Sequence, residues 1–330
     1  MSGGLLEIAG LTLSLPVDGE SRRILRGVDL SIDPGECVGL VGESGSGKSM
    51  TARSVIRMLP GGSEIGGSVR LGGDEVLAMS DRELQAVRGS RVAMIFQDPR
   101  AHIDPIRTIG DHMTEAMCLV ADRSRKEARR EAATLLEAVR LDDPDELMGR
   151  YPHELSGGML QRVMIAGALA CGPDLLLADE PTTALDVTTQ AEVVAILSDL
   201  QVERSLGVLF ITHDLELATA ICDRIAVMYA GEVVEESPAE TLHTAPLHPY
   251  TSGLLDSRPT LDDDPSLLSV IPGHPIAAFE VDEGCPFAPR CRLVDEICRR
   301  EAPPERRLGV GRVRCHHDLA TPTTPEQVAS

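Results

Sequence analysis

The sequence predicts an α/β fold in which helices cover a mainly parallel core sheet. Four short apolar runs, CVGLVG, VAMIF, DLLLAD and GVLFIT, have almost no polar face, and they occupy residues 37–42, 92–96, 174–179 and 207–212. Strands buried on both faces of a sheet have this pattern, and helices then form the outer layers. The 330 residues suit one large α/β domain with an appendage, or two modest domains, because single cores stop growing at about 250–300 residues.

The regions around these runs complete the predicted architecture. Residues 5–15 alternate as a strand does, and residues 22–36 predict a second strand closed by a Pro-Gly turn, so we expect an antiparallel β part at the N-terminus. From about residue 105 to 170 the pattern is helical, and a capping box of Ser124 and Glu127 opens one helix. This stretch predicts an inserted helical subdomain.

The last third of the chain changes character. A helix over 214–222 and a hairpin over 224–236, turned at Ala230-Gly231, follow the last apolar run. From Ser237 onward prolines accumulate and periodicity fades. We therefore predict a domain over 1–236 and a C-terminal extension over 237–330.

Composition excludes several classes of protein. Hydrophobic residues make up 42% of the chain, yet it has no Trp, 3 Tyr and 4 Phe, so the core must be aliphatic. The net charge of −21 argues against a nucleic-acid partner, because such binding needs clustered Lys and Arg. No apolar run approaches the roughly 18–20 residues that span a bilayer, and the N-terminus has no basic segment of a signal peptide. We expect a cytoplasmic chain.

A phosphate-binding loop is predicted at residues 42–49. GESGSGKS matches G-x-x-x-x-G-K-[ST] and lies between the apolar run and a plausible helix. Lys48 is expected to reach the β- and γ-phosphates and Ser49 to ligate Mg²⁺. The full set expected to contact ATP is Gly42, Glu43, Ser44, Gly45, Ser46, Gly47, Lys48, Ser49 and Met50. The plainer alternative is a Gly/Ser-rich loop that opens an ordinary helix.

An acidic pair follows the third apolar run in LLLADEP, residues 175–181. Asp179 is expected to hold Mg²⁺ through water, and Glu180 to polarise the attacking water. Alone, an apolar run followed by Asp-Glu is more often a simple strand end. Together with the phosphate loop it indicates nucleotide hydrolysis.

Further motifs resemble those of ATP-binding-cassette (ABC) ATPases, in family order over roughly residues 5–240. They are LSGGMLQR at 155–162, PTTALD at 181–186, Gln97 in IFQDP and His213 in ITHD. The resemblance implies that His213 touches the γ-phosphate and that Gln97 senses Mg²⁺ and water. The signature set consists of Ser156, Gly157, Gly158 and Gln161. The resemblance implies that this set contacts ATP held by a partner cassette. It also implies that Asp186 belongs to the loop between the cassettes. Taken singly, these residues could be a helix cap, a polar strand cap and a loop Gln.

Two positions depart from the family pattern. Family members usually stack adenine on an aromatic residue of the first strand region, where this chain offers only Leu11, Leu13 and Leu15. We therefore expect a weaker and less base-selective contact with adenine. His112 stands where related importer subunits have Gln, and it suggests no consequence.

The segment PLHPYTSGLL, residues 246–255, resembles the element after the cassette in oligopeptide, dipeptide and nickel permease ATPases. That resemblance implies peptide import, with a second similar or identical ATPase, two permease subunits and an extracytoplasmic substrate-binding protein as partners. The chain would then lie on the cytoplasmic face of the membrane. Nickel import, an exporter ATPase and, less favoured, a soluble ABC ATPase remain alternatives.

Four cysteines gather in the extension: Cys285, Cys291, Cys298 and Cys315. A reducing cytoplasm disfavours disulfides, so clustered cysteines indicate metal. Their spacings do not match paired C-x-x-C knuckles, and CPFAPRC resembles the tail of peptide permease ATPases, some of which carry a cluster. We therefore expect a [4Fe-4S] cluster, with Zn²⁺ or unligated thiols as alternatives and His316 and His317 as possible substitute ligands.

Overall fold

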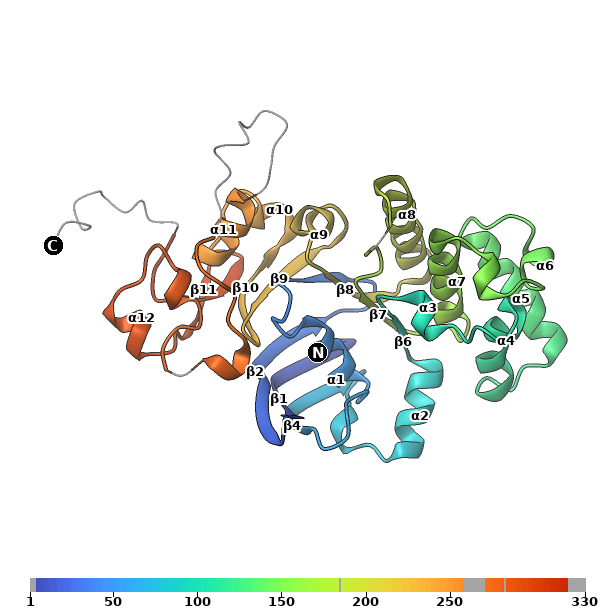
Figure 1. The fold of residues 1–330 in the computed structure, drawn as a ribbon, viewed down its shortest axis with the longest axis horizontal. Helices are drawn as coiled ribbons and strands as arrows, with labels where there is room; N and C mark the ends of the chain where they lie inside the picture. The colour runs from blue at the N-terminus through green and yellow to red at the C-terminus, as the bar shows by residue number, and fades with distance from the viewer. Residues whose placement is uncertain (1–3, 184, 258–270, 282, 320–330) are drawn as a thin grey trace.

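The computed structural model describes residues 4–183, 185–257, 271–281 and 283–319. A four-stranded antiparallel sheet near the N-terminus, an eight-stranded mixed sheet and a helical lobe make up the cassette, and the C-terminal extension lies at the opposite end from the lobe (Figure 1). Within the described residues, no helix is both long and apolar enough to cross a membrane.

The N-terminal sheet has the strand order β2-β1-β4-β5. Its bounds are β1 Leu6–Val17, β2 Glu20–Ile32, β4 Glu64–Leu71 and β5 Asp74–Glu75. A tight turn at Asp18 and Gly19, both with positive φ, joins β1 to β2. Alternate leucines of these strands, such as Leu11, Leu13 and Leu25, are fully buried. The alternation in the sequence therefore predicted this part correctly.

The eight-stranded sheet has the order β11-β12-β10-β9-β3-β8-β7-β6. Strands β6, β7, β8, β3 and β9 pair in parallel, whereas β10, β12 and β11 are antiparallel. The parallel strands are β3 Cys37–Val41, β6 Val92–Ile95, β7 Leu175–Asp179, β8 Gly207–Thr212 and β9 Arg224–Tyr229. The mainly parallel core is confirmed, and every residue of β3, β7 and β8 is buried, as continuous apolar runs require.

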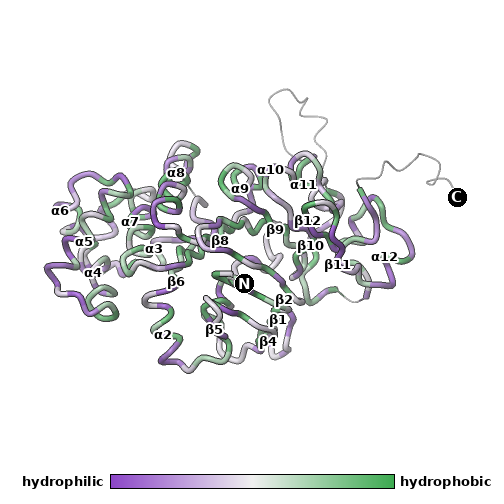
Figure 2. The backbone as a smooth tube through the Cα atoms, turned by 180° about the vertical axis from the view of Figure 1, so that it is seen from behind, coloured by the Kyte–Doolittle hydropathy of each residue, from purple (hydrophilic) through white to green (hydrophobic). Residues whose placement is uncertain are grey.

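The helical lobe contains α4 Ile109–Leu119, α5 Arg125–Ala138, α6 Pro144–Leu147 and α7 Gly157–Leu169. The capping box at Ser124 and Glu127 opens α5, as the sequence predicts. In the coloured tube, α5 and α6 carry hydrophilic stretches on the outside of the lobe (Figure 2). The other helices of the cassette are α1 Lys48–Val55, α2 Asp81–Ser90, α3 Pro99–His102, α8 Val187–Arg204 and α9 Leu215–Ile221, with the short η1 Val76–Ala78 and η2 Pro152–Glu154.

The extension packs on the cassette through strands as well as helices. Its elements are α10 Ala239–Leu242, α11 Pro249–Asp256, η4 Ala278–Glu280, η5 Ala288–Arg290, α12 Glu296–Arg300, β11 Glu305–Leu308 and β12 Gly311–Arg314. Strand β12 pairs with β10, Glu232–Pro238, so the chain's last hairpin joins the core sheet. Aromatic rings add to this contact: Tyr229 of β9 lies 4.8 Å from Tyr250 and 5.3 Å from Phe287, measured between centroids.

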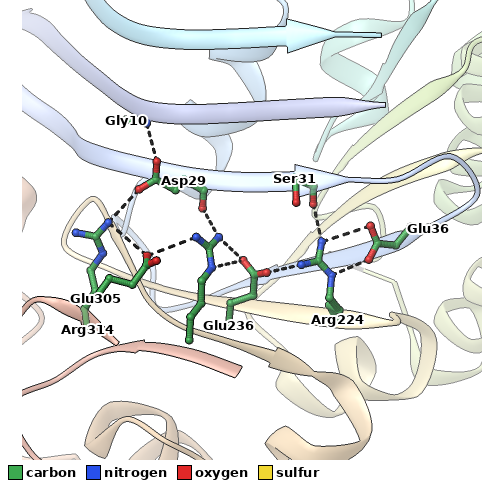
Figure 3. A network of polar contacts seen from close by, with 9 residues as sticks. Gly10, Asp29, Ser31, Glu36, Arg224, Glu236, Glu305 and Arg314 are labelled. Carbon is green, nitrogen blue, oxygen red and sulfur yellow. Dashed lines mark hydrogen bonds and ion pairs between the residues drawn. The ribbon is translucent and has the colours of Figure 1, made fainter. Parts of the chain in front are cut away.

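A network of ion pairs fixes this hairpin to the N-terminal sheet (Figure 3). Glu236 accepts hydrogen bonds from both Arg224 and Arg312, and Arg224 also pairs with Glu36 at 2.6 Å. Asp29 of β2 pairs with Arg314 at 3.0 Å. Contacts with the cassette therefore hold the extension in place.

Candidate functional site

The phosphate loop connects β3 to α1. Gly45 and Gly47 have positive φ, and Gly47 is the residue before α1. The Lys48 ammonium is 5% exposed and donates hydrogen bonds to the carbonyls of Gly42 at 2.8 Å and Glu43 at 3.0 Å. Burial lowers the pKa of Lys48, while the nearby carboxylates of Glu180 and the other acids raise it. The loop thus holds its lysine inward, next to the acidic pair.

Crowding leaves the loop little freedom. A Cβ atom on Gly42 would lie 2.2 Å from the carbonyl oxygen of Met228, so the start of the loop packs directly against β9. Ser46 is buried and its hydroxyl has no hydrogen-bond partner among the described residues, whereas Ser44 and Gly45 are exposed. Met50 is half-buried beside the apolar core.

Ser49 and Asp179 meet at the start of α1 and the end of β7. The Ser49 hydroxyl donates to Asp179 Oδ1 at 2.7 Å. Burial raises the pKa of the Asp179 carboxyl, and the bond from Ser49 opposes that rise. A hydroxyl and a carboxylate at this position are the hard oxygen donors that Mg²⁺ prefers. The donor set therefore fits Mg²⁺.

Glu180 contacts side chains from two other segments and from its own. Its Oε2 accepts hydrogen bonds from Gln97 Nε2 at 3.0 Å and Thr183 Oγ1 at 2.8 Å, and lies 3.6 Å from His213 Nδ1. Glu180 itself has φ +48, a backbone conformation uncommon for residues other than glycine. The structure therefore brings together the three residues that sequence reasoning placed in catalysis. It adds Thr183, whose only sequence signal was its place in PTTALD.

These residues line one cavity of about 800 Å³. The loop residues Ser44, Gly45, Gly47, Lys48, Ser49 and Met50 form one part, with Gln97, Glu180, Thr183 and His213, and a second part is formed by Leu15, Ile24, Ala277, Ala278 and Phe279. The second part includes residues of the C-terminal extension, which the sequence had not connected with this site.

The signature residues lie elsewhere. Ser156 accepts a hydrogen bond from the backbone N–H of Met159 at 3.3 Å and caps α7. Figure 1 places α7 in the helical lobe, apart from α1, and none of the signature residues lines the cavity. Gln161 is buried, and its Nε2 has no hydrogen-bond partner in the described part of the chain. Asp186 caps α8 by accepting from Thr189 N at 3.0 Å.

An arginine of the extension contacts the phosphate loop directly. Arg290 has a side chain 4% exposed and donates to both carboxylate oxygens of Glu43, at 2.6 Å and 3.1 Å. The backbone N–H of Glu43 also donates to the Tyr250 hydroxyl at 3.0 Å. Arg292, two residues further along the chain, is by contrast 63% exposed. No sequence signal links positions 247 residues apart.

The four cysteines of the extension occupy different environments. Cys298 and Cys315 are buried, and Cys285 and Cys291 are half-buried, all as free thiols. Burial raises the pKa of Cys285 to about 12 and that of Cys298 to about 11. In the described part of the chain, one group of three or more metal-capable side chains brings its ligand atoms within 4.8 Å of one another, and it consists of Asp295, Cys298 and His317. Only one of the four cysteines belongs to it.

Comparison with known proteins agrees with the motifs. Residues 25–183 match the ABC transporter family, and residues 234–298 match the family described as oligopeptide/dipeptide transporter, C-terminal region. The oligopeptide transport ATP-binding protein OppD of Salmonella typhimurium is 42% identical over 94% of this chain and 92% of its own. The probable peptide ABC transporter ATP-binding protein y4tR of Sinorhizobium fredii is 44% identical over 91% of this chain and 90% of its own.

A solved structure gives the same fold. The dimeric ATP-binding cassette MJ0796, bound to ADP and Pi in a post-hydrolysis state, superposes with a TM-score of 0.64 at 29% identity. It covers 71% of this chain and 98% of its own. Part of this chain therefore has no counterpart in the compared cassette.

These findings correct the expectation of a [4Fe-4S] cluster, which is wrong. The relatives are described as ATP-binding proteins, and neither they nor the matched families are described as iron–sulfur proteins. The clustered metal-capable side chains are a mixed carboxylate, thiol and imidazole group rather than the four cysteines. The structural reason is geometric: of the four cysteines, only Cys298 brings its sulfur into the described group of close ligand atoms, beside Asp295 and His317.

Motif order, site geometry and similarity over nearly the whole chain lead to one assignment. The phosphate loop, the acidic pair and the glutamine and histidine beside it have come together at one cavity. Identity of 42% extends over 94% of the chain. The protein therefore belongs to the ABC transporter family, as an ATPase.

Proposed function

We propose that this chain is the ATP-binding and ATP-hydrolysing subunit that energises an ABC importer of di- or oligopeptides. The observation that carries this proposal is the match of residues 234–298 to the oligopeptide/dipeptide transporter C-terminal region. An exporter ATPase needs no such extension. Relatives named as oligopeptide transport and peptide import ATP-binding proteins support the same cargo.

We assign the hydrolytic roles to the side chains at the cavity. Lys48 and the loop N–H groups, from Gly42 to Met50, would bind the phosphates. Glu180 would orient and polarise the attacking water, since it lies within hydrogen-bond reach of its neighbours Gln97 and Thr183. His213, 3.6 Å from Glu180, would contact the γ-phosphate.

Ser49 and Asp179 would hold Mg²⁺, with Gln97 sensing its presence. When bound, Mg²⁺ would supply positive charge that offsets the negative charge developing on the phosphate oxygens. In the structure Ser49 and Asp179 are bonded to each other at 2.7 Å. To hold the ion, Ser49 and Asp179 would give up this bond, with Asp179 reaching the ion through water, and the raised pKa of Asp179 would then fall.

The signature residues would complete a partner's site. Ser156, Gly157, Gly158 and Gln161 lie at the start of α7, away from their own phosphate loop. We propose that two cassettes close face to face, so that each α7 N-terminus meets the γ-phosphate bound by the other, with Asp186 between them. The second cassette is identical or similar to this one.

The remaining partners follow from import. We propose two permease subunits and an extracytoplasmic substrate-binding protein, with this chain bound peripherally at the cytoplasmic face of the membrane. We also propose that residues 1–236 are the nucleotide-binding domain, with a helical subdomain at about 105–170. Residues 237–330 would be the extension typical of peptide permease ATPases.

The test is reconstitution with the permease and cassette subunits encoded by neighbouring genes. ATP hydrolysis by the complex in vesicles should rise several-fold when the substrate-binding protein and peptide are added together, and labelled peptide should accumulate. Stimulation by Ni²⁺ instead of peptide would show nickel import. Co-purification with a membrane subunit that exports without a binding protein would reject import altogether.

A further inference from the structure

Phe279 of the extension is a half-exposed aromatic ring at the nucleotide cavity. It lies in η4, and 42% of the residue is exposed. The cavity that contains Lys48 and Glu180 is also lined by Phe279, next to Leu15 of β1 and Ile24 of β2. Among the described residues that line this cavity, Phe279 is the one Phe, Tyr or Trp side chain.

The position of this ring is fixed by contacts with the cassette. Arg26 of β2 donates to the carbonyls of Ala278 at 3.4 Å and Val281 at 3.2 Å, on either side of the ring. The same guanidinium pairs with Glu232 of β10 at 2.9 Å. The Arg26 side chain of β2 therefore holds η4 in place, and its ion pair with Glu232 fixes the guanidinium.

A glycine allows the extension to come this close. At Gly231, an added Cβ atom would lie 2.5 Å from the carbonyl oxygen of Ile24 and 2.9 Å from Ala278 Cβ. The turn between β9 and β10 thus meets β2 and η4 at one point. The backbone N–H of Gly231 also donates to the carbonyl of Ser46 at 2.9 Å, so the same turn contacts the phosphate loop.

The surroundings of the ring suit a flat partner. The guanidinium carbon of Arg22 lies 4.8 Å from the Phe279 centroid, so one face already contacts a planar cation. Aliphatic side chains of Leu15 and Ile24 line the same end of the cavity. This end is apolar, whereas the phosphate loop end is built from N–H groups and an ammonium.

We propose that Phe279 is the surface on which the purine base of the bound nucleotide stacks. The first strand region supplies only leucines where an aromatic was expected, and the extension supplies the missing ring from more than 260 positions further along the chain. The extension is therefore part of the ATP site. The assignment concerns nucleotide binding alone and does not depend on the transported cargo.

This stacking reads the face of the base and none of its edges. Every purine has such a face, so ATP and GTP should bind with similar affinity. The sequence predicted weak selectivity between bases because the first strand region contains no aromatic residue. The reason changes: the contact with the base is substantial, but it is not selective.

A substitution and a ligand without a base test the proposal on the full-length chain. F279A should weaken binding of Mg-ATP by roughly tenfold, which is the scale of a lost base–aromatic contact. Binding of inorganic tripolyphosphate, which has no base, should not change. I297A is the matched control, because Ile297 is also 42% exposed and in the extension but does not line the cavity. Wild-type ATP affinity in F279A, or equal losses for ATP and tripolyphosphate, would overturn the proposal.

A second variant reports on the stacking directly. The chain contains no Trp, so F279W places a single indole fluorophore at the site while keeping an aromatic face. ATP and GTP should quench its fluorescence to a similar extent, and tripolyphosphate should not. Quenching by tripolyphosphate alone, or no response to ATP despite normal ATP binding, would contradict a stacked base.

Discussion

Glu180 is held by side chains from three separate segments. Gln97 follows β6, Thr183 follows β7 and His213 follows β8, so they converge where the carboxyl ends of parallel strands meet. Oxygen Oε2 accepts from two of them, which leaves the carboxylate oriented before nucleotide arrives. Orientation of one oxygen is the property that a water-activating group needs.

Glu180→Gln should bind Mg-ATP with nearly wild-type affinity and lose turnover by roughly a hundredfold or more, because the amide cannot take the proton of the attacking water. Phosphate release and calorimetric titration measure the two effects separately. Lys48→Ala is the contrasting variant, and it should lose nucleotide binding first. Turnover of E180Q within a fewfold of wild type would assign the base to another residue.

The sequence identified Gln97, Glu180 and His213 because each lies in a short motif with fixed local context. Arg290 and Phe279 were missed for a different reason. Each acts across more than 240 positions, and a lone Arg or Phe in a proline-rich segment carries no pattern. Contacts of this kind depend on how the extension packs, and local sequence does not encode that.

At the scale of elements, η5 and α11 connect the extension to the phosphate loop. Arg290 ends η5, and its guanidinium is buried against Glu43 and 5.8 Å above the Tyr229 ring. Tyr250 of α11 accepts from the Glu43 backbone. The first residues of the phosphate loop therefore rest on two elements of the extension.

Arg290→Ala should destabilise the folded chain by about 2 kcal/mol, because it leaves the Glu43 carboxylate without its charged donor. It should also weaken ATP binding by loosening the loop. Arg292→Ala is the matched control, since Arg292 is two residues away but 63% exposed, and it should change stability by less than about 0.5 kcal/mol. Denaturant unfolding and ATP titration of both variants check this. Equal effects of the two substitutions would show that the ion pair has no special role.

The start of α11 should respond to acid. His248 is 1% exposed, and its Nδ1 accepts from Tyr250 N at 3.0 Å. Burial lowers the pKa of His248 to about 3, whereas the unfolded chain protonates near pH 6.5. This depressed pKa contributes stability that is fully present above about pH 6.5 and is lost as the pH falls toward 3.

Between pH 7 and pH 5, the wild-type chain should therefore lose about 2 kcal/mol more stability than His248→Asn. Asn keeps a side-chain acceptor for the helix cap but does not titrate. Urea unfolding at both pH values gives the comparison. Equal losses of stability in the two proteins would contradict this prediction, because they would show that titration of His248 does not contribute to the pH dependence.

The sequence predicted the strands that are buried along their whole length, but it did not predict the hairpin whose strands depend on contacts with the cassette. The runs at β3, β7 and β8 are apolar except for Asp179 and Thr212 at two of their ends, and they could be assigned from sequence. The β11–β12 hairpin has the charged sequence ERRLGVGRVR. Its strands exist because β12 pairs with β10 and because Arg312 and Arg314 reach acids of the cassette.

On the scale of the whole molecule, the phosphate loop and the signature residues, to which we assign contacts with ATP, lie apart. The phosphate loop lines the nucleotide cavity, whereas the N-terminus of α7 lies in the helical lobe (Figure 1). The phosphate loop and the α7 N-terminus of one chain cannot both contact the same nucleotide without a large rearrangement. The face-to-face pair of cassettes that we propose would bring the two together.

Gly157→Asp tests this assembly without disturbing the monomer. A Cβ atom on Gly157 meets no atom within 4 Å, and an acid at the first turn of a helix is favourable beside the helix dipole. The new carboxylate would, however, face the γ-phosphate bound by a partner cassette and repel it. In sedimentation experiments with Mg-ATP, E180Q should form a dimer, with itself or with the neighbouring cassette, and E180Q/G157D should remain monomeric. Both proteins should bind ATP at Lys48 with similar affinity, because the phosphate loop is unchanged. Nucleotide-dependent dimers of E180Q/G157D as stable as those of E180Q would show that α7 does not meet the partner's nucleotide.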